Sequence, residues 1–142
     1  MLDFLPLVKA IQSLSAALAD AAGRRGDLLA RDGCPQRFEY IDELCVNSLR
    51  RHLEDLSDSP PAVDALGFKD MVSLAGERSL VVDVAAWFAF RELRNTTAHA
   101  YDPVKAELVF AALPEFLRHA EQLGAVLLDS QSRRPASDGL SV

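Results

Sequence analysis

The sequence lacks the features of disulfide-stabilised, secreted and membrane-spanning proteins. Its two cysteines, Cys34 and Cys45, provide neither a disulfide framework nor a four-ligand zinc pattern. The longest apolar stretch, from Leu80 to Phe90, is interrupted by Asp83 and is much shorter than the roughly 20 residues of a membrane helix. The start of the chain does not have the order of a secretory signal. We therefore expect reduced cysteines and a cytoplasmic protein.

The sequence is also poor in positive charge. It has 15 Lys and Arg against 21 Asp and Glu, a formal net charge of −6. Sequence-independent binding to nucleic acid depends on many Lys and Arg contacts with phosphates, so a broad nucleic-acid surface is excluded, while a local basic cleft is not. The 142 residues, 49% of them hydrophobic, are enough for one buried core. We predict a single helical domain over residues 1–130 and a polar, flexible tail over 131–142.

Apolar residues recur at helical spacing, and no segment alternates as a strand would. The predicted helices span about residues 3–22, 37–56, 61–75, 80–98 and 103–128. In the second helix, Phe38 and Cys45 share an apolar stripe, whereas Asp42 and Glu43 are placed off it. Pro114 is expected to kink the last helix or to begin a new one. The prediction is an all-α fold, an up-and-down bundle of four main helices plus a short helix.

Most of the usual chemical motifs are absent. The sequence has no phosphate-binding glycine loop, no HExxH, no paired CxxC and no G-x-S-x-G turn, so no cofactor or metal is expected. We interpret the single histidines His52 and His119 as partly exposed surface residues, and Cys45 as a small core residue. Trp87 and Phe88 are interpreted as core or dimer-interface residues.

One stretch concentrates reactive side chains within nine positions. It contains Arg94, Asn95, His99, Tyr101 and Asp102. On an ideal helix Asn95 and His99 share a face, but Arg94 and His99 are about 140° apart. Convergence of Arg94 and His99 therefore needs a distorted last turn, or a twofold axis that brings two copies of the stretch together.

An imidazole and a guanidinium in one cleft could cleave RNA without a metal. Imidazole moves protons near neutral pH, and arginine holds a phosphate oxygen and the developing negative charge. The alternative is a polar helix C-terminus in which His99 only lies near the negative end of the dipole.

The chain resembles the HEPN (higher eukaryotes and prokaryotes nucleotide-binding) family over roughly Leu29 to Leu123. It is most similar to short bacterial members known as HepT-type toxins or nucleotidyltransferase substrate-binding proteins. Asp32 to Tyr40, running into Glu43-Leu44, is similar to the family's "DG…QRFEY…EL" helix. Arg94 to Tyr101 fits its R-x4-H-x-Y pattern at every fixed position.

This resemblance implies a homodimer in which Arg94 and His99 of both chains form a metal-independent ribonuclease site acting on RNA such as tRNA. Supporting roles are expected of Asn95 and Asp102. The implied partner is a minimal nucleotidyltransferase antitoxin that transfers adenylyl groups to Tyr101, and a bulky anionic adenylate there would oppose an RNA phosphate.

Two other functions stay open at this point. The same motif could hold a nucleotide or substrate for a nucleotidyltransferase partner without cutting RNA, because Arg94 and His99 would bind phosphate equally well. A purely structural dimerisation bundle is the third possibility.

Overall fold

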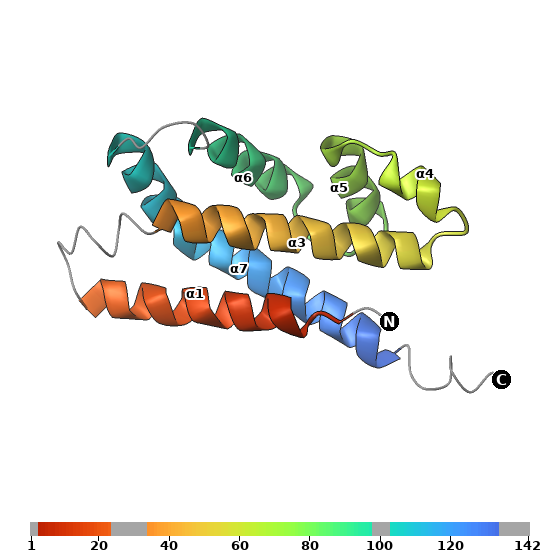
Figure 1. Ribbon diagram of the computed structural model, residues 1–142, viewed down its shortest axis with the longest axis horizontal. Helices are drawn as coiled ribbons and strands as arrows, with labels where there is room; N and C mark the ends of the chain where they lie inside the picture. The colour runs from red at the N-terminus through yellow and green to blue at the C-terminus, as the bar shows by residue number, and fades with distance from the viewer. Residues whose placement is uncertain (1–2, 24–33, 98–102, 134–142) are drawn as a thin grey trace.

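The computed structural model describes residues 3–23, 34–97 and 103–133, and over these ranges the protein is entirely helical, with no strand (Figure 1). The helices are α1 (Leu5–Gly23), α3 (Cys34–Leu56), α4 (Pro60–Asp64), α5 (Phe68–Glu77), α6 (Val84–Thr97) and α7 (Pro103–Arg133). The predicted all-α class is confirmed. None of the helices in the described ranges is long and apolar enough to cross a membrane.

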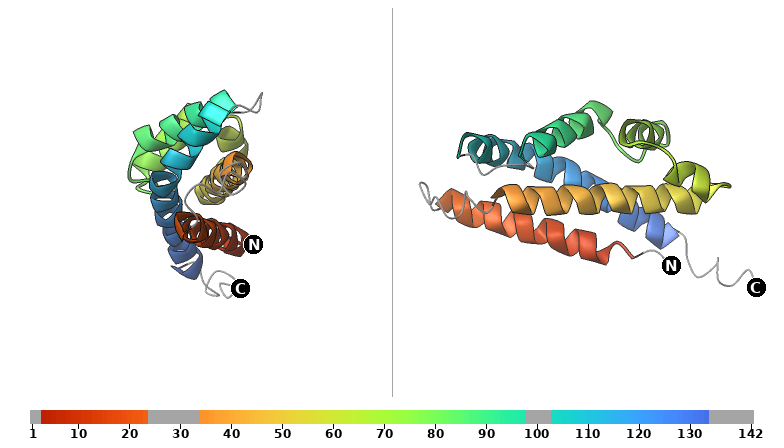
Figure 2. Two further views of the ribbon diagram at one scale, coloured as in Figure 1. Left: turned by 90° about the vertical axis from the view of Figure 1, so that its left-hand side faces the viewer. Right: turned by 45° about the horizontal axis from the view of Figure 1, so that its top comes forward.

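The long helices α1, α3 and α7 form the body of the bundle. The last helix, α7, packs against both α3 and α1, so the first and last helices lie side by side (Figures 1 and 2). On the other side of α3, α6 packs on α3 and α7, while α5 packs on α6 and α3. The short α4 packs on α3. One face of α3 therefore packs against α1 and α7, and another face packs against α4, α5 and α6.

Aromatic rings join α3, α6 and α7 in the core. Phe116 of α7 is fully buried, and its ring lies edge-on to Phe38 at 4.9 Å and to Phe90 at 5.1 Å between centroids. Trp87 lies 6.2 Å from the same ring. Cys45 is also fully buried, which confirms its interpretation as a core residue. Phe116 is thus the common contact of the three helices.

Two predicted helix boundaries in the middle of the chain are wrong. The single short helix expected over residues 61–75 is two helices, α4 and α5, because the chain is extended at Gly67, the N-cap of α5. The α6 helix begins at Val84 rather than near residue 80, and Asp83 Oδ1 accepts a hydrogen bond from the Ala86 amide at 3.1 Å. This side-chain bond satisfies an amide that the first helical turn leaves unpaired. At Pro114 no new helix begins, because α7 is continuous there.

The interpretation of the two helical histidines as surface residues is also wrong. His52 is only 2% exposed and His119 only 4% exposed. The His52 ring packs edge-on against Phe4, and the His119 ring packs against Phe90. His119 Nε2 lies 3.1 Å from Glu115 Oε1. An imidazole has an apolar body and a polar tip, so the His119 ring fits in the core while its Nε2 atom reaches Glu115 at the edge.

The α5 and α6 helices approach each other closely at Gly76. A Cβ atom built at Gly76 would lie 2.5 Å from Cγ2 of Val84, the first residue of α6. That separation is far below ordinary van der Waals contact, so any other residue at this position would require the Val84 side chain, or α6 with it, to move. The position of α6 matters because this helix carries Arg94.

Candidate functional site

The structure describes two of the five predicted site residues. Arg94 and Asn95 lie near the C-terminal end of α6. His99, Tyr101 and Asp102 lie outside the described residues. The convergence of Arg94 with His99 therefore stays a prediction.

Two carboxylates of α3 hold the Arg94 side chain. Arg94 Nη1 lies 3.6 Å from Asp42 Oδ2, and Arg94 Nη2 lies 3.5 Å from Glu43 Oε2. The arginine side chain is 24% exposed, so part of it remains accessible to a ligand. Pairing with two adjacent carboxylates restricts the guanidinium and gives it a defined orientation at the surface of α3.

Asp42 was not among the predicted site residues, and its predicted position off the apolar stripe of α3 is wrong. Its side chain is only 1% exposed. It lies four residues after Phe38, which is the helical spacing of a core position. A carboxylate at core spacing, rather than any known motif, was the signal that could have identified it.

Burial raises the pKa of Asp42 from 3.8 to about 6, and the positive charges of Arg94 and Arg91 offset part of that increase. Neither carboxylate oxygen of Asp42 has a hydrogen-bond partner among the described residues. The separation of 3.6 Å from Arg94 is an ion pair but is too long for a good hydrogen bond. The buried carboxylate is therefore poorly compensated when it is ionised.

We expect Asp42→Asn to change how stability depends on pH. Because folding raises the pKa of Asp42, its stabilising contribution is fully present below about pH 4 and is lost as the pH rises through about 6. A shift from 3.8 to about 6 corresponds to about 3 kcal/mol. Asparagine does not ionise, so the free energy of unfolding of the variant should rise relative to wild type by about 2–3 kcal/mol between pH 4 and pH 8. Urea denaturation across this range measures the difference, and parallel pH profiles for the two chains would contradict the assignment.

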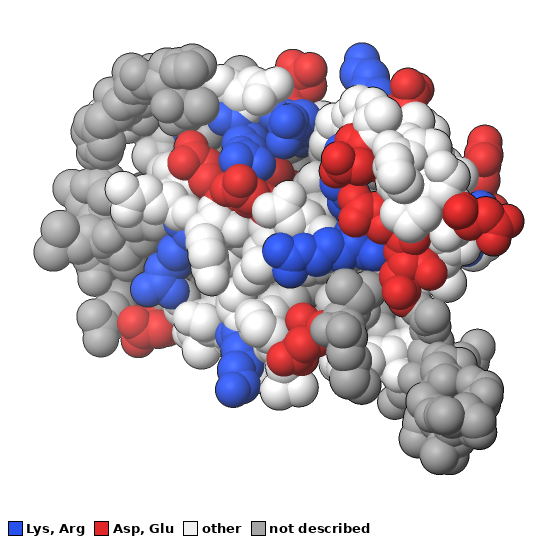
Figure 3. All heavy atoms as spheres, turned by 45° about the vertical axis from the view of Figure 1, so that its right-hand side comes forward, with Lys and Arg blue, Asp and Glu red and all other residues white. Residues whose placement is uncertain are grey.

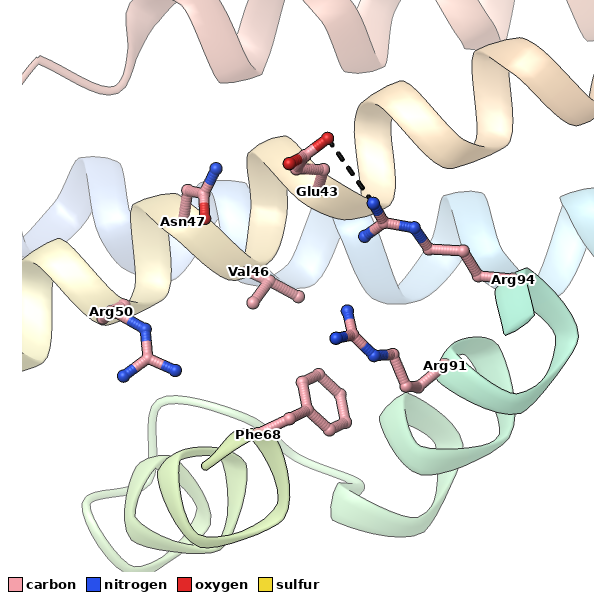
Figure 4. Close-up of a pocket in the computed structure, with 7 residues that line it drawn as sticks. All are labelled: Glu43, Val46, Asn47, Arg50, Phe68, Arg91 and Arg94. Atoms are coloured by element: carbon pink, nitrogen blue, oxygen red, sulfur yellow. Dashed lines mark ion pairs between the residues drawn. The ribbon is translucent and has the colours of Figure 1, made fainter. Parts of the chain in front are cut away.

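A pocket of about 260 Å³ lies beside Arg94, between α3, α5 and α6 (Figure 4). Its lining residues are Glu43, Val46, Asn47, Arg50, Phe68, Arg91 and Arg94. Figure 4 shows the Arg91 and Arg94 side chains reaching from α6 towards α3, where Glu43 pairs with Arg94. The motif arginine, Arg94, therefore belongs to a larger polar pocket that was not predicted from the sequence.

The described residues contain no group of three or more His, Cys, Asp or Glu side chains arranged to hold a metal ion. The polar chemistry beside Arg94 is that of guanidinium, amide and carboxylate groups. Such a set can bind an anion through charge-assisted hydrogen bonds.

Comparisons with known proteins agree with this fold. Residues 2–129 match the family described as "nucleotidyltransferase substrate binding protein like". A protein of Haemophilus influenzae named probable ribonuclease HepT is 36% identical over 85 residues, which are 60% of this chain and 58% of that protein. The chain thus spans less than two thirds of the length of this curated relative.

A solved structure from Haemophilus influenzae is similar over most of both chains. It is described as revealing the fold of a substrate-binding domain of a nucleotidyltransferase, and it has a TM-score of 0.82 at 28% sequence identity. The similarity covers 88% of this chain and 98% of that one. The resemblance found in the sequence is confirmed: the chain belongs to the family of nucleotidyltransferase substrate-binding-like proteins.

Proposed function

We propose that the chain is the toxin of a toxin–antitoxin pair and acts as a metal-independent endoribonuclease. The observation that carries this proposal is the motif arginine, Arg94, oriented by Asp42 and Glu43 and still partly exposed beside a pocket. The similarity to a protein named probable ribonuclease HepT supports it. The proposed activity would take place in the cytoplasm.

In the proposed reaction, His99 moves protons and Arg94 stabilises charge. An imidazole removes the proton of a ribose 2′-hydroxyl, and the 2′-oxygen attacks the adjacent phosphorus. The bond from phosphorus to the 5′-oxygen breaks, and the leaving oxygen takes a proton from an imidazolium. Arg94 binds the phosphoryl oxygens while negative charge develops on them. A homodimer would supply two copies of both residues, with Asn95 and Asp102 in supporting roles.

The proposed antitoxin is a minimal nucleotidyltransferase that transfers adenylyl groups to Tyr101. Tyr101 is two residues after His99 in the sequence. An adenylate on this phenol would add bulk and negative charge near the imidazole, and both would oppose the approach of an RNA phosphate.

Incubation of the chain with total tRNA in EDTA, beside a His99→Ala variant, tests the proposed activity. Mass spectrometry first identifies chains whose Tyr101 carries no adenylate. We expect cleavage by the wild type alone, because alanine at this position leaves no group to move the protons. Cleavage by the His99→Ala variant at the wild-type rate, or an intact RNA with both chains, would contradict the proposal.

A second candidate function is a non-catalytic subunit that holds a nucleotide or substrate for a nucleotidyltransferase. The solved structure described as a nucleotidyltransferase substrate-binding domain favours it, as does the arginine-lined pocket. This function predicts nucleotide binding by calorimetry without RNA cleavage. Nucleotide binding that Arg94→Ala leaves unchanged would count against it.

A further inference from the structure

The pocket beside Arg94 is basic although the chain as a whole is acidic. Three of its lining residues are arginines, Arg50, Arg91 and Arg94, against one carboxylate, Glu43. The formal charge of the whole chain is −6. On the face in Figure 3, basic and acidic side chains of the described residues are interspersed and do not form a broad area of one sign. The concentration of guanidinium groups in one hollow is therefore a local feature that favours an anion.

Arg50 is fixed in place by the chain itself. Its Nη1 atom donates hydrogen bonds to the carbonyl oxygens of Val63 at 3.0 Å and Leu66 at 3.1 Å, and lies 3.4 Å from that of Asp64. These carbonyls lie at the end of α4 and just after it. These hydrogen bonds engage only one nitrogen of the Arg50 guanidinium. Because the acceptors are neutral carbonyl oxygens, the positive charge of Arg50 is not neutralised. Arg50 therefore contributes an immobilised positive charge to the pocket wall before any ligand binds.

Arg91 is oriented by an aromatic ring rather than by a carboxylate. Its Cζ atom lies 4.8 Å from the centre of the Phe68 ring, a cation–π contact. No carboxylate lies within ion-pair distance of Arg91 among the residues that the structure describes. Stacking on a ring leaves the edge of the guanidinium, with its N–H groups, available for two parallel hydrogen bonds. Arg94 differs in this respect, because Asp42 and Glu43 already engage it.

The size and donors of the pocket suit a phosphoryl group. A volume of about 260 Å³ is below the range of roughly 300–1,000 Å³ typical of pockets that enclose a drug-sized molecule. The Asn47 amide adds a neutral donor to the arginine N–H groups. Arginine binds phosphate oxygens with matched, two-pronged geometry.

We propose that this pocket binds a phosphoryl group of a nucleotide-containing ligand. This group would lie next to the phosphoryl group that Arg94 binds in the proposed function. Arg91 is the direct ligand, Arg50 is a fixed charge, and Phe68 positions Arg91. The inference rests on the proposed function for the chemical class of the ligand, and it adds a second phosphate contact to the same site. An RNA strand and a free nucleotide share this chemistry.

Affinity measurements in a His99→Ala chain test the inference without any cleavage. A fluorescently labelled single-stranded oligoribonucleotide is titrated by anisotropy, and ATP by calorimetry, both in EDTA. Arg91→Gln is expected to weaken binding of the oligoribonucleotide about tenfold, because it removes one charge-assisted phosphate contact. It should also reduce the slope of log affinity against log salt by about 0.7.

Arg51→Gln is the matched control. Arg51 is an exposed residue of α3 that does not line the pocket, and its replacement removes the same charge. We expect this variant to keep the parent affinity within about twofold. Arg91→Lys keeps the positive charge but loses the planar guanidinium that donates two parallel hydrogen bonds. Its affinity for the oligoribonucleotide should therefore fall between those of the parent and Arg91→Gln. Thermal denaturation of each variant checks that it is folded.

The two titrations, with the oligoribonucleotide and with ATP, distinguish the sources of the phosphoryl group. Weakening by Arg91→Gln in the oligoribonucleotide arm alone supports an RNA strand, and weakening in the ATP arm supports a free nucleotide. Equal effects of Arg51→Gln and Arg91→Gln, or no measurable binding of either ligand by the parent, would overturn the inference. Because affinity is measured in a chain without His99, the result is independent of whether the wild type cleaves RNA.

Discussion

Under the proposed ribonuclease function, an Arg94→Ala variant is expected to cleave RNA about 100- to 1000-fold more slowly than the wild type, the usual effect of removing one donor that stabilises transition-state charge. Of the fixed residues of the R-x4-H-x-Y motif, Arg94 is the one that lies within the described ranges. Its guanidinium is restrained by two carboxylates of α3 at 3.5–3.6 Å, and the side chain is still 24% exposed. Initial rates with tRNA in EDTA measure the loss. A variant that retains the wild-type rate would exclude Arg94 from the reaction.

The structure also shows how to separate a loss of chemistry from a loss of folding. Arg94→Ala leaves Asp42 buried without its nearest positive charge, so this single variant should be less stable than the wild type. Adding Asp42→Asn removes the uncompensated charge. We expect the double variant to be more stable than Arg94→Ala but equally inactive. Arg51→Ala, an exposed arginine outside the pocket, is expected to keep the wild-type rate.

Phe116→Ala is expected to lower the free energy of unfolding by about 3–5 kcal/mol, the typical result of removing a fully buried phenylalanine. Phe116 is 0% exposed and contacts rings from both α3 and α6. The cavity would therefore open at the point where three helices meet, and no single helix could move to fill it. Natural domains are stable by only about 5–15 kcal/mol, so this loss is a large part of the total.

Urea denaturation of Phe116→Ala, beside Leu108→Ala as control, measures this effect. Leu108 lies on the same helix, α7, but its side chain is exposed, so its truncation should change the free energy of unfolding by less than about 0.5 kcal/mol. A loss below about 1 kcal/mol for Phe116→Ala would show that the aromatic cluster is not the centre of the core.

The helices that could be predicted are those whose signals are local. The apolar spacing within α1 and α3 and the proline that begins α7 act over one or two turns, so they can be recognised without knowing the fold. The division of residues 61–75 into α4 and α5 could not be predicted because a single glycine, Gly67, is compatible both with a weakened helix and with a break between two helices. The burial of His52 and His119 was missed because partners from α6 and the N-terminal segment cover them.

The candidate site shows the same difference between features encoded in neighbouring residues and features that depend on how distant helices pack. Arg94 was found because it belongs to a motif contained in a few consecutive residues. Its partners Asp42 and Glu43 are on another helix, about 50 positions earlier in the sequence. Periodicity describes which face of its own helix a residue occupies, but it contains no information about which helix packs opposite. The pairing of Arg94 and the pocket between three helices therefore emerge only from the tertiary structure.

The close approach of α5 and α6 at Gly76 has a genetic consequence. Any other residue at position 76 would place a Cβ atom against the Val84 side chain, where α6 begins, and would displace that side chain or the start of the helix. Arg91 and Arg94 are carried on the same helix, so a shift of the helix would move them as well. Alleles with impaired function can therefore arise at a position that touches neither ligand nor motif. In a mutational map of the gene, such alleles would lie well upstream of the codons for the motif.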